Sequence, residues 1–299
     1  MIDSLYAKLR RSIIYTLSPI APTLCSRMMY AHRFHRPLRL RKPETLNEKN
    51  MWLKLHDYRD NPLVTRCADK YLVRDYVRQA GCGDILNELL FVWDRPEEIN
   101  WDELPDSFVL KCNHGCGYNL ICTDKANMDE AQCKAQLRQW LDTDYWRLYT
   151  ELQYKGIPKK ILCEKFLGQE NHLPIDYKVY CFHGEPLYIL VCEERESGKP
   201  RFFFFDKQWN FCPITHDGRE APADFTLPRP VHLEKMLEYS GRLSAPFPYV
   251  RADFYETKEK LVFGELTFTP AGALDTGRLP ETDRMFGKLL KIQQHKPEI

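Results

Sequence analysis

The chain has 299 residues, of which 43% are hydrophobic and 28% are charged, as is typical of a globular protein with a large buried core. Its net charge of +1 provides no overall field that would favour nucleic acid. No apolar run reaches the roughly 18–20 residues of a membrane-spanning helix, and no signal peptide is visible at the start. Eleven cysteines without regular spacing argue against a disulfide framework and indicate a reducing cytoplasm.

The first 42 residues are strongly basic, with nine Lys and Arg residues against one acid, Asp3. Apolar residues at helical spacing predict a helix over residues 2–17. They are Leu5, Leu9, Ile13 and Leu17. Two interpretations of this helix stay open. It docks on the body with a solvated basic face, or it contacts an anionic membrane surface.

Further helices follow from capping and periodicity. Thr45 and Glu48 form a capping box that predicts a helix through residues 49–56. Residues 69–78, 129–142 and 232–243 also have helical patterns. Apolar runs of strand character occupy residues 108–112, 120–123, 161–167, 177–182, 186–193, 201–205, 249–255 and 261–267. Several neighbouring strands are hairpin-like, so the mixture predicts an α+β or mixed α/β fold.

A glycine loop, residues 113–119, joins the strands at 108–112 and 120–123. Gly115 and Gly117 let the backbone approach an anion closely and offer it N–H groups. Lys111, at the end of the first strand, supplies a cation. The pattern suits a cover for phosphates, although an ordinary glycine hairpin beside a solvated lysine is the competing interpretation.

Three shorter segments are candidates for nucleotide contacts. The extended segment 163–167 offers a backbone edge for a purine, with Glu164 as an acceptor for an amine or a ribose hydroxyl. Asp176 and Lys178 share a strand face, so they pair with each other or point at phosphates. Lys70, after Asp69 at a predicted helix start, is a second candidate phosphate lysine. Each of these also has a purely structural interpretation.

Two acids lie within apolar strands near the end of the chain. Asp253 and Glu265 sit on runs joined by a short charged link, as in a hairpin. A carboxylate buried in a strand is costly unless it is paired or binds a metal. The pair therefore predicts a divalent-cation site, unless Arg251 simply neutralises Asp253.

Other motifs point elsewhere. Asp142 and Asp144 match the Asp-x-Asp pattern of many glycosyltransferases, but they lie at a predicted helix end. The cluster Cys112, His114, Cys116 and Cys122 lacks the paired spacing of a zinc site. The chain has neither a Gly-x-Ser-x-Gly elbow nor a Walker-type loop.

The order of the motifs is more specific than any one of them. A lysine at a strand end, a glycine loop, an acidic hinge, an Arg-x-Asp strand and a Glu strand ending in Pro-Ala-Gly follow one another. The segments are 43–49, 69–74, 104–117, 176–184 and 263–272. Together they resemble the ATP-grasp superfamily, and especially its TupA-like members of teichuronopeptide and surface-polysaccharide biosynthesis. The resemblance covers about residues 43–290 and leaves only the basic N-terminal segment outside.

The resemblance implies ATP and Mg²⁺ as cofactors, with ATP held between two lobes with antiparallel sheets. The implied nucleotide residues are Lys70, Lys111, Asn113, Gly115, Gly117, Glu164, Lys165, Phe166, Leu167 and Asp176. Asp253, Glu265 and Thr267 would hold Mg²⁺. Many superfamily members have Asn where this chain has Thr267. How firmly a second metal ion would be bound is therefore left open. Lys178 would face the phosphates, Arg251 would steady an acyl phosphate, and the turn 270–272 would lie near the acceptor.

The implied activity is that of an ATP-dependent carboxylate–amine ligase acting through an acyl phosphate, with a uronic acid of a surface polysaccharide and an amine or amino acid as substrates. We expect a basic segment 1–42, an N-terminal lobe 43–105, a lid 106–165 and a metal-binding part 166–299. The expected location is cytoplasmic, with contact at the inner membrane face through residues 1–42 left open. A polysaccharide glycosyltransferase and a non-catalytic nucleotide-binding scaffold remain alternatives. The sequence does not identify the sugar acid, the amine or the oligomeric state.

Overall fold

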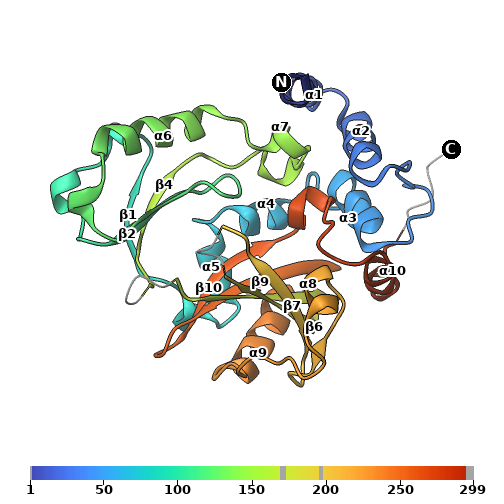
Figure 1. Cartoon of the computed structure of the whole chain (residues 1–299). Coiled ribbons are helices and arrows are strands. Elements are labelled where there is room, and N and C mark those ends of the chain that lie inside the picture. Colours follow the sequence, from blue (N-terminus) through green and yellow to red (C-terminus); the bar gives the residue numbers. More distant parts are fainter. Residues whose placement is uncertain (1, 169–172, 195–197, 294–299) are drawn as a thin grey trace.

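The computed structural model describes residues 2–168, 173–194 and 198–293, and within them two antiparallel sheets surrounded by helices (Figure 1). The four-stranded sheet has the order β1 (Leu89–Trp93), β4 (Ile161–Lys165), β2 (Phe108–Cys112) and β3 (Asn119–Cys122). The six-stranded sheet has the order β10 (Leu261–Thr267), β9 (Tyr249–Glu256), β5 (Ile175–Phe182), β6 (Glu185–Glu193), β7 (Arg201–Asp206) and β8 (Phe211–Cys212). The predicted α+β class with antiparallel sheets is confirmed.

The helices frame the two sheets (Figure 1). They are α1 (Ile2–Leu17), α2 (Pro22–Phe34), α3 (Leu46–Leu55), α4 (Pro62–Ala68), α5 (Val73–Gln79), α6 (Glu130–Asp142), α7 (Trp146–Tyr149), α8 (His216–Glu220), α9 (Leu233–Ser244) and α10 (Pro280–Leu289). Helix α6 packs on the four-stranded sheet through buried Leu137, whereas α9 packs on the six-stranded sheet through Leu233, Met236 and Leu243.

Most predicted elements are confirmed to within a few residues, and the capping box at α3 is formed as predicted. The helix predicted over residues 69–78 starts later in the structure, where α5 begins at Val73. Asp69 Oδ1 instead accepts hydrogen bonds from the backbone N–H groups of Tyr71 and Leu72, which fixes a turn before the helix. Strand β1 was not predicted. It lies before the expected lid boundary at residue 106 yet pairs with β4.

Helix α1 docks on the body, and Leu17 of its predicted apolar spacing packs against the buried cluster there. Ile14 is buried against α2 and the turn after β10, whereas Leu9 and Ile13 face solvent. The six-stranded sheet contributes residues of both faces to the core. Its inward residues, such as Val179, Ala252 and Leu266, join the largest apolar cluster. The opposite face is mixed, because Tyr180 and Phe182 are buried there in the same cluster while Lys178 is charged.

The close approach of α10 to α3 depends on Gly287. A Cβ atom at this position would lie 2.1 Å from the carbonyl oxygen of Glu44. Lys49 Nζ donates to the carbonyl oxygens of Gly287 and Leu290 at 2.6 and 2.7 Å. These bonds provide partners for carbonyl groups at the C-terminal end of α10.

We predict that Gly287→Ala lowers the free energy of unfolding by about 2 kcal/mol or more, because the added methyl group overpacks a backbone contact. Gly156→Ala is the matched control, since its Cβ would find its nearest neighbour at 3.9 Å. Thermal unfolding followed by circular dichroism measures both. Equal melting temperatures for the two variants would contradict this account of the α3–α10 contact.

Candidate nucleotide and metal site

Strand pairing brings three predicted site residues into one row across the six-stranded sheet. Glu265 on β10 and Lys178 on β5 both lie directly opposite Asp253 on the intervening strand β9. Residues directly opposite each other in an antiparallel pair project from the same face of the sheet. The row Lys178–Asp253–Glu265 is therefore a consequence of register, and its members come from distant parts of the sequence.

A β-bulge sets this register. The pairing of β10 with β9 shifts by one residue between Phe263 and Glu265, and this places Glu265 opposite Asp253. The extra residue is Gly264, where a Cβ atom would lie 2.9 Å from the carbonyl oxygen of Asp253. The glycine thus permits the close backbone approach that aligns the two carboxylates.

Asp253 is buried and held by two cations. Arg251 Nε and Nη2 donate to its two carboxylate oxygens at 2.7 and 2.5 Å, and Lys178 Nζ lies 3.3 Å from Oδ2. Lys178 Nζ also contacts Asp176 Oδ2 at 2.5 Å. Burial raises the pKa of the Asp253 carboxyl, and the charges of Arg251 and Lys178 oppose that rise. Although burial favours its neutral form, Asp253 and Asp176 raise the pKa of the Lys178 ammonium.

Glu265 connects the row to the glycine loop. Thr267 Oγ1 donates to Glu265 Oε1 at 2.9 Å, and Lys70 Nζ lies 3.3 Å from Oε2. Lys70 Nζ also donates to the carbonyl oxygen of Gly115 at 2.5 Å. Burial opposes ionisation of Glu265, but Lys70 and Arg251 lower its pKa to about 2. The carboxylate is therefore ionised at neutral pH, and Lys70 bridges it to the loop.

The base of the glycine loop is fixed by buried Asn113. Its amide donates to Asp69 Oδ1 and to the carbonyl of Pro158, both at 2.9 Å, and its oxygen accepts from the Lys160 N–H at 2.7 Å. Gly117 has a φ of +78°, a conformation that suits glycine. The sequence-predicted loop therefore has one rigid end and one glycine that permits a turn.

The predicted nucleotide edge lies on the four-stranded sheet. Lys111 Nζ on β2 contacts Glu164 Oε2 on β4 at 2.7 Å, and Arg74 Nη1 approaches Oε1 at 3.7 Å. Glu164 is buried, yet these two cations lower its pKa, Lys111 more than Arg74. The side-chain amide of Asn87 donates a hydrogen bond to the carbonyl oxygen of Lys165 at 2.8 Å, so this backbone oxygen is accessible to a side-chain donor. Phe166 and Leu167 follow on, partly exposed.

The two acids of the row and the neighbouring Thr267 fit a hard divalent cation. Asp253, Glu265 and Thr267 offer two carboxylates and a hydroxyl, all oxygen donors of the kind that Mg²⁺ prefers. In the described part of the chain, no group of three or more His, Cys, Asp or Glu side chains is placed to hold a metal. A cation here would therefore be shared between two carboxylates and other oxygens, and it would replace contacts that Lys70 and Arg251 make now.

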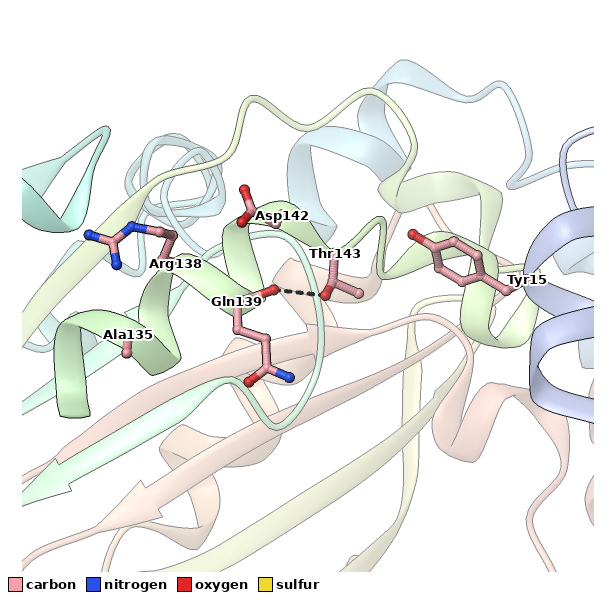
Figure 2. A pocket seen from close by; sticks show the side chains of 6 residues that line it. All are labelled: Tyr15, Ala135, Arg138, Gln139, Asp142 and Thr143. Atoms are coloured by element: carbon pink, nitrogen blue, oxygen red, sulfur yellow. Dashed lines mark hydrogen bonds between the residues drawn. The ribbon is translucent and has the colours of Figure 1, made fainter. Parts of the chain in front are cut away.

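The competing motifs are not assembled into sites. Asp144 is paired with Arg147 at 3.1 Å and with Lys159 at 3.2 Å. Asp142 lines an open hollow of about 560 Å³ between α1 and α6 (Figure 2). The other lining residues are Tyr15, Ala135, Arg138, Gln139 and Thr143. None of the predicted nucleotide or metal residues reaches this hollow. The candidate zinc cysteines Cys112 and Cys122 are buried and Cys116 is exposed, all as free thiols.

Sequence reasoning missed several residues that build the site. Arg74 and Asn87 are buried partners of the nucleotide edge. Arg74 ends the segment 69–74 but was not predicted as a site residue, and Asn87 lies in none of the predicted motifs. Lys54 is fully buried on α3, where Nζ donates to the carbonyls of Tyr149 and Gly272 at 2.9 and 3.1 Å. Lys54 thereby anchors the turn 270–272 that was predicted to lie near the acceptor. Burial lowers its pKa to about 8. The only sign of this role in the sequence was that Lys54 occupies an inward position of the predicted helix.

A family model described as TupA-like ATPgrasp matches residues 48–291. The chain belongs to the TupA-like ATP-grasp family. Its basic helices α1 and α2 lie outside the matched residues. No curated protein matches the sequence.

Solved structures with a related fold share little sequence with this TupA-like protein. The D-alanine–D-alanine ligase of Bacillus anthracis complexed with ATP is 14% identical over 75% of this chain and 63% of that one, with a TM-score of 0.45. The L-amino acid ligase of Bacillus licheniformis is 14% identical over 76% and 49%, with a TM-score of 0.44. The ATP-grasp ligase PsnB, complexed with a precursor variant, Mg and ADP, is 11% identical over 74% and 58%, at 0.39. The chain spans less than two thirds of each.

The lowered pKa of Glu265 has a consequence for acid stability. Its folded-state pKa, about 2, lies below the ordinary value of 4.5, so its contribution is fully present above pH 4.5 and disappears as the pH falls towards 2. The shift corresponds to roughly 3 kcal/mol. We expect Glu265→Gln to be less stable than the wild type at pH 7, and the difference to shrink between pH 4.5 and 2. Urea unfolding across this range measures it. A constant difference would contradict the pairing of Glu265 with Lys70.

Proposed function

We propose that the protein is an ATP-dependent carboxylate–amine ligase, in which ATP activates a carboxylate as an acyl phosphate and an amine then displaces phosphate. The row of Lys178, Asp253 and Glu265, with Arg251 and Lys70 beside it, carries this proposal. Membership of the TupA-like ATP-grasp family supports it. We further propose that the carboxylate belongs to a uronic acid of a cell-surface polysaccharide precursor, and that the amine is an amino acid or a similar small amine.

The chemistry explains why such a site needs both signs of charge. A free carboxylate resists attack by an amine, because its leaving group would be oxide. Transfer of the γ-phosphoryl group forms a bond between a carboxylate oxygen and phosphorus and breaks the bond to ADP. The amine then attacks the carbonyl carbon, phosphate leaves, and the amine nitrogen gives up its proton. Negative charge accumulates on phosphate oxygens in the first step and on the carbonyl oxygen in the second.

We assign the residues to these steps by position. Lys111, Lys178 and Lys70 would neutralise the phosphate oxygens, and the glycine loop would exclude water from the transferring group. Asp253, Glu265 and Thr267 would hold Mg²⁺, which would supply positive charge to offset the charge of the phosphates. Arg251 would stabilise the carbonyl oxygen of the acyl phosphate as the amine attacks. The adenine and ribose would lie along the segment 164–167, with Glu164 and Asp176 at its polar edges.

The position of Thr267 bears on whether such a site is competent for turnover. Its hydroxyl donates to Glu265 and lies 3.3 Å from Arg251 Nη2, so Thr267 contacts the charged groups around the row. A threonine oxygen is a neutral ligand, as an asparagine oxygen would be, although its side chain is shorter. We therefore propose a catalytic site and not a nucleotide-binding scaffold.

We predict that the purified protein releases ADP and phosphate only when Mg²⁺, ATP, a uronic acid and an amine are all present. Asp253→Asn and Lys111→Met should each reduce this release at least about 100-fold, because the first removes a carboxylate that would hold Mg²⁺ and the second removes a cation at the phosphates. Mixtures of uronic acids and amino acids, assayed by coupled ADP detection and mass spectrometry of the amide, would identify the pair.

The control variants keep the same chemistry outside the site. Asp142→Asn with Asp144→Asn tests the rival transferase motif, and Lys160→Met removes a lysine that pairs with Asp94 at 2.7 Å. Both should retain wild-type activity. Inactivity of the Asp142 and Asp144 double variant with an active Asp253→Asn variant would favour a transferase. ATP binding without turnover in any mixture that includes lipid-linked uronic acids would favour a scaffold.

A further inference from the structure

The two N-terminal helices expose apolar side chains that the fold does not use. Half of the large apolar side chains exposed within the described residues lie between positions 9 and 28. They are Leu9 (59% exposed), Ile13 (38%), Ile20 (79%), Leu24 (53%) and Met28 (38%). Leu9 and Ile13 are one turn apart on α1, and Leu24 and Met28 are one turn apart on α2. Ile20 lies in the connection between the two helices, and we call these five exposed side chains the apolar strip.

This strip is not a helix face that awaits docking onto the body. The inner sides of α1 and α2 are already buried through Ile14, Cys25, Met29 and Tyr30, which pack with Met51 of α3 and with Ala273 and Leu274. Ser18 Oγ and Ser26 Oγ are also hydrogen-bonded, to the Arg147 carbonyl and to Thr150, both at 2.8 Å. The helix pair is therefore fixed in place, and its outer side faces away from both sheets (Figure 1).

Basic residues lie close to the apolar strip in sequence. Residues 1–42 contain nine Lys and Arg residues and one acid. Among the contacts of the described residues, only Arg36 and Arg39 form ion pairs, with Glu44 and Glu48 at the start of α3. The remaining basic residues are Lys8, Arg10, Arg11, Arg27, Arg33, Arg41 and Lys42. Lys8, Arg11 and Arg27 are exposed and adjoin the strip directly in sequence.

We propose that the outer side of α1 and α2 is a docking surface for an anionic lipid bilayer. Large apolar side chains bordered by Lys and Arg are the combination that binds the interface of such a bilayer, where the apolar groups enter the acyl-chain boundary and the cations meet the headgroups. The charge asymmetry of the segment selects an anionic surface. The surface lies outside the residues matched by the family model. In this proposal it holds the protein at a membrane and takes no part in the nucleotide site.

The test uses the full-length protein and vesicle flotation, with phosphatidylcholine alone or mixed with phosphatidylglycerol. The wild type should float with the mixed vesicles, remain behind with phosphatidylcholine alone, and detach as salt rises. Ile20→Ser with Leu24→Ser should weaken binding at least tenfold, because two apolar anchors are lost. Arg11→Gln with Arg27→Gln should weaken it about 25-fold, since each cation near an anionic surface contributes about fivefold.

Matched controls change the same residue types elsewhere on the surface. Ile175→Ser with Val231→Ser removes exposed apolar side chains, and Lys258→Gln with Lys260→Gln removes exposed cations from the turn between β9 and β10. Both should bind as the wild type does. Circular dichroism and melting temperature confirm that each variant is folded.

Three results would overturn the proposal. Absence of wild-type binding to the mixed vesicles at low salt is one, and undiminished binding of the Ile20 and Leu24 variant is another. The third is lipid-independent self-association in sedimentation velocity that is lost in the same variant, which would make the strip an interface between two copies of the chain.

Discussion

The site depends on one constraint, which is that Asp253 is a carboxylate removed from water in the middle of a sheet. Such a group is stable only with cations and hydrogen-bond donors around it. Arg251, two residues along the same strand, and Lys178, on the neighbouring strand, meet this need. Glu265 and Lys70 extend the arrangement to the glycine loop. With Asp176 the cluster has three acids and three bases, so its charges balance. In our proposal Mg²⁺ and a triphosphate exchange partners with this cluster, and no buried charge is left alone.

Much of this could be predicted from sequence because it follows from strand periodicity. Arg251 and Asp253 are two residues apart on an apolar strand, and so share a face in any register. The short link to the next strand also makes a hairpin the expected pairing. The one-residue bulge at Gly264 was not predictable, since the spacing alone does not say which residue of β10 meets Asp253. Without the bulge, Glu265 would point to the other face.

The residues that sequence reasoning missed belong to contacts between distant elements. Lys70 was predicted as a phosphate lysine, but its contacts with Glu265 and Gly115, which follow the turn at Asp69, were not predicted. Arg74 and Asn87 act through tertiary contacts, and the local sequence does not indicate those contacts. The N-terminal helices illustrate the same limit. The apolar spacing left open whether Leu9 and Ile13 face the body or a membrane surface. Packing buries Ile14 instead, because partner surfaces decide which side of a helix is buried.

The most direct test of the central claim is a crystal structure with Mn²⁺, as an anomalous scatterer in place of Mg²⁺, and a non-hydrolysable ATP analogue. The account predicts an anomalous peak bonded to carboxylate oxygens of both Asp253 and Glu265, with Lys70 and Lys178 turned from those carboxylates towards phosphate oxygens. A peak elsewhere, or a nucleotide bound while the Lys70–Glu265 and Lys178–Asp253 pairs remain intact, would contradict it.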